Sequence, residues 1–240
     1  MKILALETSG VVAGAALIED NMILSEFVLN NKLTHSQTIM PMVDEVLKRA
    51  QREISEIDYF ACSNGPGSFT GLRIGAATAK GFGLSLKKPV IGVPTLDALA
   101  YGMFNNEKII CPMTDARRSE VYTGFYTWEN GNFKKLCENA VLHIDRVLSL
   151  AEEYNNEVIF LGDGIKIHGE RILQCEKFSL APACCNMPKA SNVAALAREI
   201  ILSGEAGEFK IEYLQKSQAE RERLQKEREI QNERSTSHDI

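Results

Sequence analysis

The sequence lacks the features by which membrane proteins and nucleic-acid-binding proteins are usually recognised. No uncharged apolar stretch approaches the roughly 18 residues that indicate a membrane-spanning helix. The apolar start of the chain is interrupted by Glu7, too early for the hydrophobic region of a signal peptide. The formal net charge is −5, so the chain has no basic excess of the kind that binds nucleic acid unaided. We therefore expect a protein that binds neither membranes nor nucleic acid by itself.

Cysteine pairs with the spacing of metal or redox sites are also missing. The chain has six cysteines, but no two of them have the C-x-x-C spacing of zinc sites and dithiol redox centres. Most of them lie in apolar runs, which predicts reduced and mainly buried thiols in a cytoplasmic protein. The adjacent Cys184 and Cys185 are expected to be two plain thiols.

The glycine-rich stretch SNGPGSFTGLRIG, residues 63–75, matches neither of the common phosphate-binding fingerprints. A Walker loop requires a second glycine followed by lysine, and neither is found at the required distance. The dinucleotide fingerprint G-x-G-x-x-G fails by one residue, because Gly65, Gly67 and Gly71 give G-x-G-x-x-x-G. The stretch is a tight strand-to-helix turn with Ser68 as the helix N-cap, or a helix N-terminus that receives an anion.

The sequence shows no recognisable metal platform or nucleophile. A helical metal pair needs a second histidine three or four residues after His35, and those positions hold Thr38 and Ile39. No G-x-S-x-G pattern is present. Glu7 ends the first predicted strand, where it either orients a hydrated cation or lies exposed. We predict neither a bound metal nor a catalytic residue.

The order of the predicted elements indicates an α/β protein. Three strands, a helix, a strand, a second helix, a strand and a short helix follow one another over residues 1–103. A polar connection then leads to a looser second lobe, giving predicted domains at 1–103 and 104–214. The charged residues 215–240 have almost no apolar side chains, which predicts a frayed or disordered tail.

Small residues recur every four positions along the predicted helix 69–86. They are Gly71, Gly75, Ala79 and Gly83. An interior glycine costs a helix about 1 kcal/mol relative to alanine, so close packing must offset the cost. Two alternatives remain: the stripe packs against the chain's own sheet, or it meets a helix of a second chain.

Several ordered motifs together resemble the TsaB family, and the resemblance extends over nearly the whole chain to about Arg221. These motifs are LALETS (4–9), HS (35–36), MPM (40–42), the glycine-rich stretch 63–73, DAR (115–117), EVY (120–122), GDG (162–164) and YLQKSQAE (213–220). The resemblance implies an actin/Hsp70-like (ASKHA) fold of two lobes, each a mixed sheet flanked by helices. It also implies a non-catalytic subunit that binds and supports TsaD. TsaD is the transferase that forms threonylcarbamoyladenosine next to the anticodon of tRNAs reading codons that start with A.

The resemblance also implies partners. The chain would form a heterodimer with TsaD, and the ATPase TsaE would join it. It would contact tRNA only through this complex, and it would form a homodimer when it is alone. No intrinsic cofactor is implied, and ATP or ADP would lie at the partner interface. The predicted partner-interface residues are His35, Ile39, Met42, Gly71, Gly75, Thr78, Ala79, Phe82 and Gly83.

Three residues are candidate contacts for a nucleotide or anion, namely Glu7, Ser68 and Asp163. Glu7 departs from the pattern of actin-like ATPases, which usually have aspartate at this place. The rival hypotheses are an actin-like ATPase that uses Glu7 and the cleft between the lobes, and a glycoprotease-type metalloenzyme acting alone.

Overall fold

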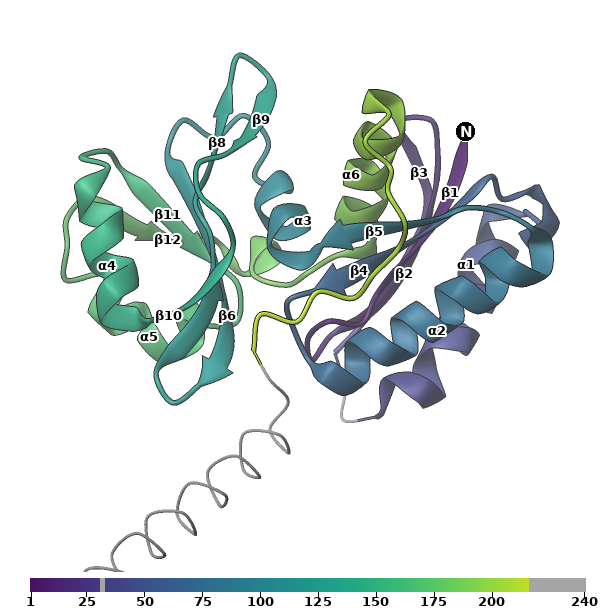
Figure 1. Cartoon of the computed structure of the whole chain (residues 1–240), viewed down its shortest axis with the longest axis horizontal. Helices are drawn as coiled ribbons and strands as arrows, with labels where there is room; N and C mark the ends of the chain where they lie inside the picture. The colour runs from purple at the N-terminus through teal and green to yellow at the C-terminus, as the bar shows by residue number, and fades with distance from the viewer. Residues whose placement is uncertain (31–32, 216–240) are drawn as a thin grey trace, which may run out of the picture.

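The computed structural model describes residues 1–30 and 33–215, so the predicted tail lies outside the described residues except for Gln215. Figure 1 shows two lobes side by side, each built on its own sheet. The predicted α/β fold of two lobes, each a mixed sheet flanked by helices, is confirmed. No helix in the described part of the chain is long and apolar enough to cross a membrane.

The first lobe is a five-stranded mixed sheet with helices on both faces. Its elements are β1 (Lys2–Glu7), β2 (Ala13–Glu19), β3 (Met22–Leu29), α1 (His35–Ala50), η1 (Ile54–Glu56), β4 (Tyr59–Gly65), α2 (Phe69–Leu86), β5 (Val90–Pro94) and α3 (Thr95–Tyr101). The strand order is β3-β2-β1-β4-β5, and β1 runs antiparallel to β2 but parallel to β4. Helices α1 and α2 lie next to each other on one face of this sheet (Figure 1).

The second lobe contains a seven-stranded mixed sheet. Its elements are β6 (Ile109–Arg117), β7 (Glu120–Thr123), β8 (Tyr126–Glu129), β9 (Asn132–Lys135), β10 (Ala140–His143), α4 (Ile144–Glu153), β11 (Val158–Leu161), α5 (Ile165–Ile172), β12 (Phe178–Leu180) and η2 (Ala183–Cys185). Strand β6 is central, antiparallel to β7 and parallel to β11. Its C-terminal end faces the first lobe across the cavity described below.

The predicted boundary of the second lobe is wrong at its C-terminal side. Helix α6 (Ala190–Ser203) packs on the first sheet, where Val193 and Ala194 share a buried cluster with Ile3 and Ala5. The chain after α6 also stays with the first lobe, because Phe209 belongs to the core beneath α1 and α2. The first sheet needs an apolar cover on its second face, and α6 supplies it.

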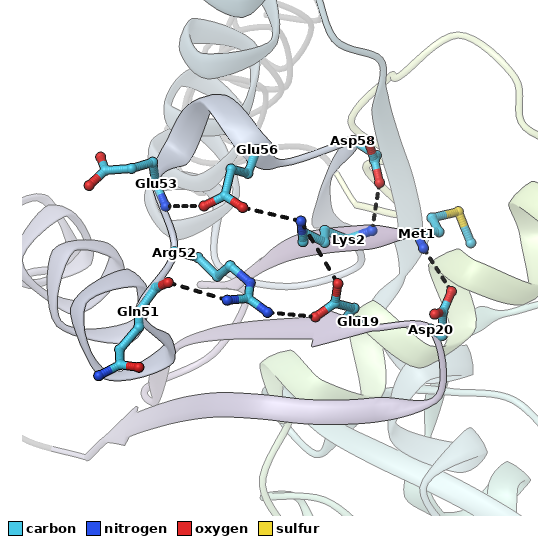
Figure 2. Close-up of polar contacts among 9 residues, drawn as sticks. All are labelled: Met1, Lys2, Glu19, Asp20, Gln51, Arg52, Glu53, Glu56 and Asp58. Carbon is cyan, nitrogen blue, oxygen red and sulfur yellow. Dashed lines mark hydrogen bonds and ion pairs between the residues drawn. The ribbon is translucent and has the colours of Figure 1, made fainter.

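A network of charged groups lies at the end of the first lobe where β1 begins and β2 ends (Figure 2). The Glu19 carboxylate pairs with Lys2 at 3.8 Å and with Arg52 at 3.1 Å, and so joins β1 and β2 to the segment after α1. Lys2 also pairs with Glu56 at 3.3 Å. Partly exposed pairs of this kind contribute about 0–1 kcal/mol each, so the network supports the fold without determining it.

All six cysteines are free thiols, as predicted, but the expectation that most are buried is wrong. Cys62 and Cys111 are buried, whereas Cys137 and Cys184 are exposed. Burial raises the pKa of the Cys62 thiol, which therefore stays protonated and packs as a small apolar group.

Candidate functional site

A cavity of about 700 Å³ lies between the two lobes. The first-lobe wall is formed by the segment that follows β1, from Ser9 to Val12, and by the loop that leads into α2. The second-lobe wall is formed by the end of β6 and by the loop and helix that follow β11. The lining side chains that matter below are Ser68, Phe69, Thr95, Thr114, Asp115, Tyr122, Asp163 and Asn186.

The loop that enters α2 is a tight turn held against the end of β1. Ser68 is the N-cap of α2, and its hydroxyl accepts a hydrogen bond from the Gly71 N–H at 3.3 Å. The Ser68 N–H donates to the Ser9 carbonyl at 2.7 Å. A side chain at Gly67 would overlap the Ser9 backbone, and one at Gly71 would overlap the Thr8 carbonyl. The predicted N-capped turn is therefore confirmed, and these two glycines permit the close approach of two backbone segments.

Glu7 is a buried carboxylate held by hydroxyl and backbone donors. Its Oε1 accepts from the Ser9 N–H at 2.6 Å and from the Ser9 hydroxyl at 2.5 Å, while the Ser63 hydroxyl donates to its Oε2. Burial raises the pKa of Glu7, and the hydrogen bonds from Ser63 and Ser9 and the charge of His35 oppose that rise. The alternative of an exposed strand end is wrong. Glu7 does not line the cavity.

Asp163 lines the cavity from the second lobe. Its Oδ1 accepts a hydrogen bond from the Asp115 N–H at 3.0 Å. Burial raises the pKa of Asp163, and the neighbouring Asp115 charge adds to that rise, while the backbone hydrogen bond opposes it. Of the three candidate anion contacts, the cavity therefore brings together Ser68 and Asp163 and leaves Glu7 behind its wall.

Three polar atoms on the cavity wall have no hydrogen-bond partner within the described residues. They are Thr95 Oγ1, Thr114 Oγ1 and Asn186 Oδ1. Sequence reasoning missed all three, because single threonine and asparagine residues give no pattern. These atoms are buried within the wall, and together with the two carboxylates their residues give the cavity a polar lining. Among the described residues, no group of three or more His, Cys, Asp or Glu side chains is placed to hold a metal ion.

The small-residue stripe of α2 packs against the chain's own sheet, which is one of the two alternatives given above. A side chain at Gly75 would overlap Thr8 Oγ1 and would lie 2.8 Å from Cys62 Sγ, while one at Gly83 would overlap Val90. The buried members of the predicted partner interface are Ile39, Met42, Gly71, Gly75, Ala79 and Gly83. These six residues lie inside the first lobe and not on its surface, so the structure does not favour them as partner contacts.

The other three predicted interface residues are partly exposed and have contacts of their own. His35 Nε2 donates to the Gly10 carbonyl at 2.8 Å. Phe82 stacks on Phe60 with ring centroids 5.3 Å apart, and the Thr78 hydroxyl donates to the Ile74 carbonyl at 2.9 Å.

The outer face of α1 and α2 presents a different set of residues. We call this surface the outer helix face; its exposed members include Met40, Pro41, Arg73, Ala77, Gly81 and Leu84. Met40 is 49% exposed and Leu84 is 84% exposed. A side chain at Gly81 would meet nothing within 4 Å. The face therefore combines exposed apolar side chains with the charged Arg73, and it has a second pair of small residues, Ala77 and Gly81.

Residues 22–223 match the family described as TsaD, tRNA N6-adenosine threonylcarbamoyltransferase. The chain is 31% identical over 201 residues to the tRNA threonylcarbamoyladenosine biosynthesis protein TsaB of Bacillus subtilis (strain 168), and the match covers 83% of this chain and 88% of the relative. It is 35% identical over 167 residues to TsaB of Escherichia coli (strain K12), with 68% and 72% covered.

Two solved structures from Pseudomonas aeruginosa are similar in fold. A protein described as similar to peptidase YeaZ superposes with a TM-score of 0.76 at 28% identity, covering 89% of this chain and 99% of that chain. YeaZ itself superposes with a TM-score of 0.73 at 28% identity, covering 86% and 95%. The likeness thus includes both lobes.

Proposed function

This chain belongs to the TsaB family of tRNA threonylcarbamoyladenosine biosynthesis proteins, with an actin-like (ASKHA) fold, and from that membership we propose that it is a non-catalytic subunit. In this proposal it docks a TsaD-type transferase through the outer helix face and supports threonylcarbamoyladenosine formation on tRNA. TsaE joins this chain and the transferase, and the chain contacts tRNA only as part of that complex. The same face joins two copies of the chain when the transferase is absent.

The observation that carries the docking proposal is the composition of the outer helix face. Leu84 and Met40 expose apolar side chains there, while Ala77 and Gly81 leave room for another helix to approach closely. Close approach increases the van der Waals contact between two helices. The opposite face of the same sheet is covered by α6, and α1 and α2 form the other helical layer of this lobe (Figure 1).

The surroundings of Glu7 support a non-catalytic role. Actin-like catalysis would need this carboxylate to face a nucleotide and its cation. Here Glu7 is buried behind the cavity wall, and Ser9 and Ser63 already donate to both of its oxygens. We therefore assign Glu7 to the fold, where it ties the end of β1 to β4.

A matched pair of variants tests the docking proposal. Leu84→Glu and Leu202→Glu each place a carboxylate in the last turn of a helix on an exposed leucine; Leu84 belongs to the outer helix face and Leu202 to α6. We expect Leu84→Glu to weaken binding of a purified TsaD-type transferase by about 5–30-fold, which corresponds to 1–2 kcal/mol. Leu202→Glu should bind like the unaltered chain, as measured by calorimetric titration.

Equal binding by the two variants would contradict the assignment of the outer helix face. Gly81→Arg is a further probe, because the open space around Gly81 lets the variant fold while the long side chain obstructs a partner helix. Reconstitution of the tRNA modification with and without this chain tests the supporting role. ATP turnover by the isolated chain would favour the rival ATPase hypothesis.

A further inference from the structure

The segment that follows α6 crosses from the first lobe to the second beside the cavity. We call residues 209–215 the strap. Figure 1 shows this segment, in yellow, running from α6 over the first sheet toward the space between the lobes. The strap begins in the first-lobe core, where Phe209 is 6% exposed, and Lys80 lies over its ring at 5.2 Å.

The strap is then held along the end of β4. The Asn64 side-chain amide donates to the Lys210 carbonyl at 3.2 Å, and the Glu212 N–H donates to the Asn64 carbonyl at 2.8 Å. Gly65 lies so close beneath the strap that a side chain there would overlap the Glu212 carbonyl. Its φ of +123° is a backbone conformation that suits glycine. Position 65 therefore accommodates the strap, which explains the first glycine of the stretch 63–75.

Tyr213 fixes the strap to the start of α2. Its ring stacks on Phe69 with centroids 4.3 Å apart and planes 7° from parallel. Arg73 Nε donates to the Tyr213 hydroxyl at 3.1 Å, and the Arg73 guanidinium lies over both rings at 5.6 and 5.9 Å. A stacked pair together with a cation–π contact contributes more than buried area alone.

Gln215 makes the contact with the second lobe. Its Nε2 donates to Glu120 Oε2 at 3.0 Å, and its Oε1 accepts from the Tyr122 hydroxyl at 3.4 Å. Glu120 and Tyr122 both belong to β7. The first-lobe end of the strap is thus held by many contacts, and within residues 209–215 the side chain of Gln215 ties the strap to β7 through these two hydrogen bonds.

We propose that the strap is an interlobe latch that sets the width of the cavity, with Gln215 as its releasable end. Phe69 and Tyr122, the side chains that Tyr213 and Gln215 engage, line the cavity from opposite lobes. Release of Gln215 removes the hold of the strap on β7 while Tyr213 stays on α2, so the lobes can open at the cavity about α3, whose Leu96 and Leu99 stay packed in the second lobe. The proposal depends on contacts within this chain and is independent of docking to a transferase.

An exchange of groups between Gln215 and Glu120 tests the latch. Gln215→Glu removes the donor and sets one carboxylate against another, so it releases the strap. Glu120→Gln alone keeps an acceptor for the Gln215 amide and leaves the latch closed. The double variant Glu120→Gln with Gln215→Glu restores a donor opposite an acceptor, with the direction reversed.

The distance between the lobes is the measurement. Spin labels at exposed Lys48 of α1 and Glu152 of α4 report it by pulsed electron resonance in the isolated full-length chain. For Gln215→Glu we expect the fraction of molecules outside the original distance peak to rise about fivefold, the factor equivalent to about 1 kcal/mol. Glu120→Gln and the double variant should give the original peak.

An unchanged distance distribution for Gln215→Glu overturns the proposal, provided that its circular dichroism shows the native fold. A broadened distribution that the double variant fails to restore also overturns it, because the pair would then not be the latch. Leu214→Ala is the matched control, since Leu214 lies in the strap between the two anchors and is 37% exposed. That control should leave the peak in place.

Discussion

Replacing Gly75 by alanine tests whether the small-residue stripe serves internal packing. The added methyl group would overlap Thr8 Oγ1 and crowd Cys62 Sγ, and Thr8 and Cys62 are both fully buried. Overfilling of a packed core costs about 1–3 kcal/mol. Displacement of the Thr8 hydroxyl also breaks its hydrogen bond to the Gly71 carbonyl, which measures 2.8 Å and contributes about 1 kcal/mol. The higher helix propensity of alanine stabilises the folded state by about 1 kcal/mol, so we expect a net loss of about 1–3 kcal/mol in the free energy of unfolding.

Gly81→Ala is the matched control on the same helix. A side chain there meets nothing within 4 Å, so the gain in helix propensity of about 1 kcal/mol is not offset by crowding. For a chain of this length, 1 kcal/mol shifts the Tm by roughly 2–4 °C. We therefore expect Gly81→Ala to raise the Tm by about 2–4 °C, and Gly75→Ala to lower it by about 4–8 °C for a 2 kcal/mol loss.

Calorimetric melting of the isolated chain separates the two explanations of the stripe. If the stripe were a seam for a partner helix, both variants would be stabilised in the absence of that partner, because alanine favours the helix at each position. A Gly75→Ala chain that melts at or above the Tm of the unaltered protein would therefore refute internal packing. With that result, a substitution at Gly75 could be used to test docking. The crowding around Gly75 now rules this out, because a larger side chain there would disturb the fold itself.

Two further predictions concern the buried carboxylate and the strap. Because burial raises the pKa of Glu7 above its ordinary value of 4.5, the folded state binds this proton more tightly, and the unaltered chain loses stability as pH rises from that value. Glu7→Gln should therefore gain Tm relative to the unaltered chain near neutral pH, with a difference that shrinks toward pH 4.5; a difference that grows on acidification contradicts the assigned cause. Phe209→Ala should destabilise the chain by about 3–5 kcal/mol in urea unfolding, because Phe209 is buried in the first-lobe core. A loss below about 1 kcal/mol would show that the strap is not part of that core.

The helices of the first lobe were predictable because their signals are local. The Thr34–Gln37 capping box marks the start of α1, and Ser68 marks the start of α2, which runs over the predicted residues 69–86. Each of these signals depends on residues within one or two turns of each other, so the chain's own sequence carries them in full.

The second lobe was less predictable because its elements are short. Helix α5 has eight residues and strand β12 has three, too few to show a period of 3.6 or 2. The position of α6 was missed for a different reason. Its apolar face is evident, but only the folded sheet shows that β1 and β2 have a second face to cover. The apolar pattern of a helix indicates that one of its faces is buried, but it does not indicate which part of the protein covers that face.

The same distinction governs the candidate site. Glu7 ends β1 and looks available in the sequence, yet Ser63 lies 56 positions later and completes the donors that enclose it. Conversely, Thr95 and Asn186 carry no motif but reach one cavity wall from two distant segments. Residues that meet only after folding share no motif, and for this reason the sequence did not show that six of the nine predicted interface residues are buried.

The return of the chain to the first lobe makes the two lobes interdependent. Helix α6 covers the second face of the first sheet, so a fragment that ends before α6 leaves Ile3 and Ala5 exposed to water on that side. The second lobe is thus inserted between two parts of the first. Because the strap follows α6 after the short segment 204–208, its first-lobe end is fixed by the core of the lobe that the insertion interrupts. At the strap, a change in the angle between the lobes would act on Gln215, which two hydrogen bonds hold to β7, sooner than on Phe209, which a packed core holds. Helix α3 joins the lobes elsewhere, because Leu96 and Leu99 share a buried cluster with Ile110 of the second lobe.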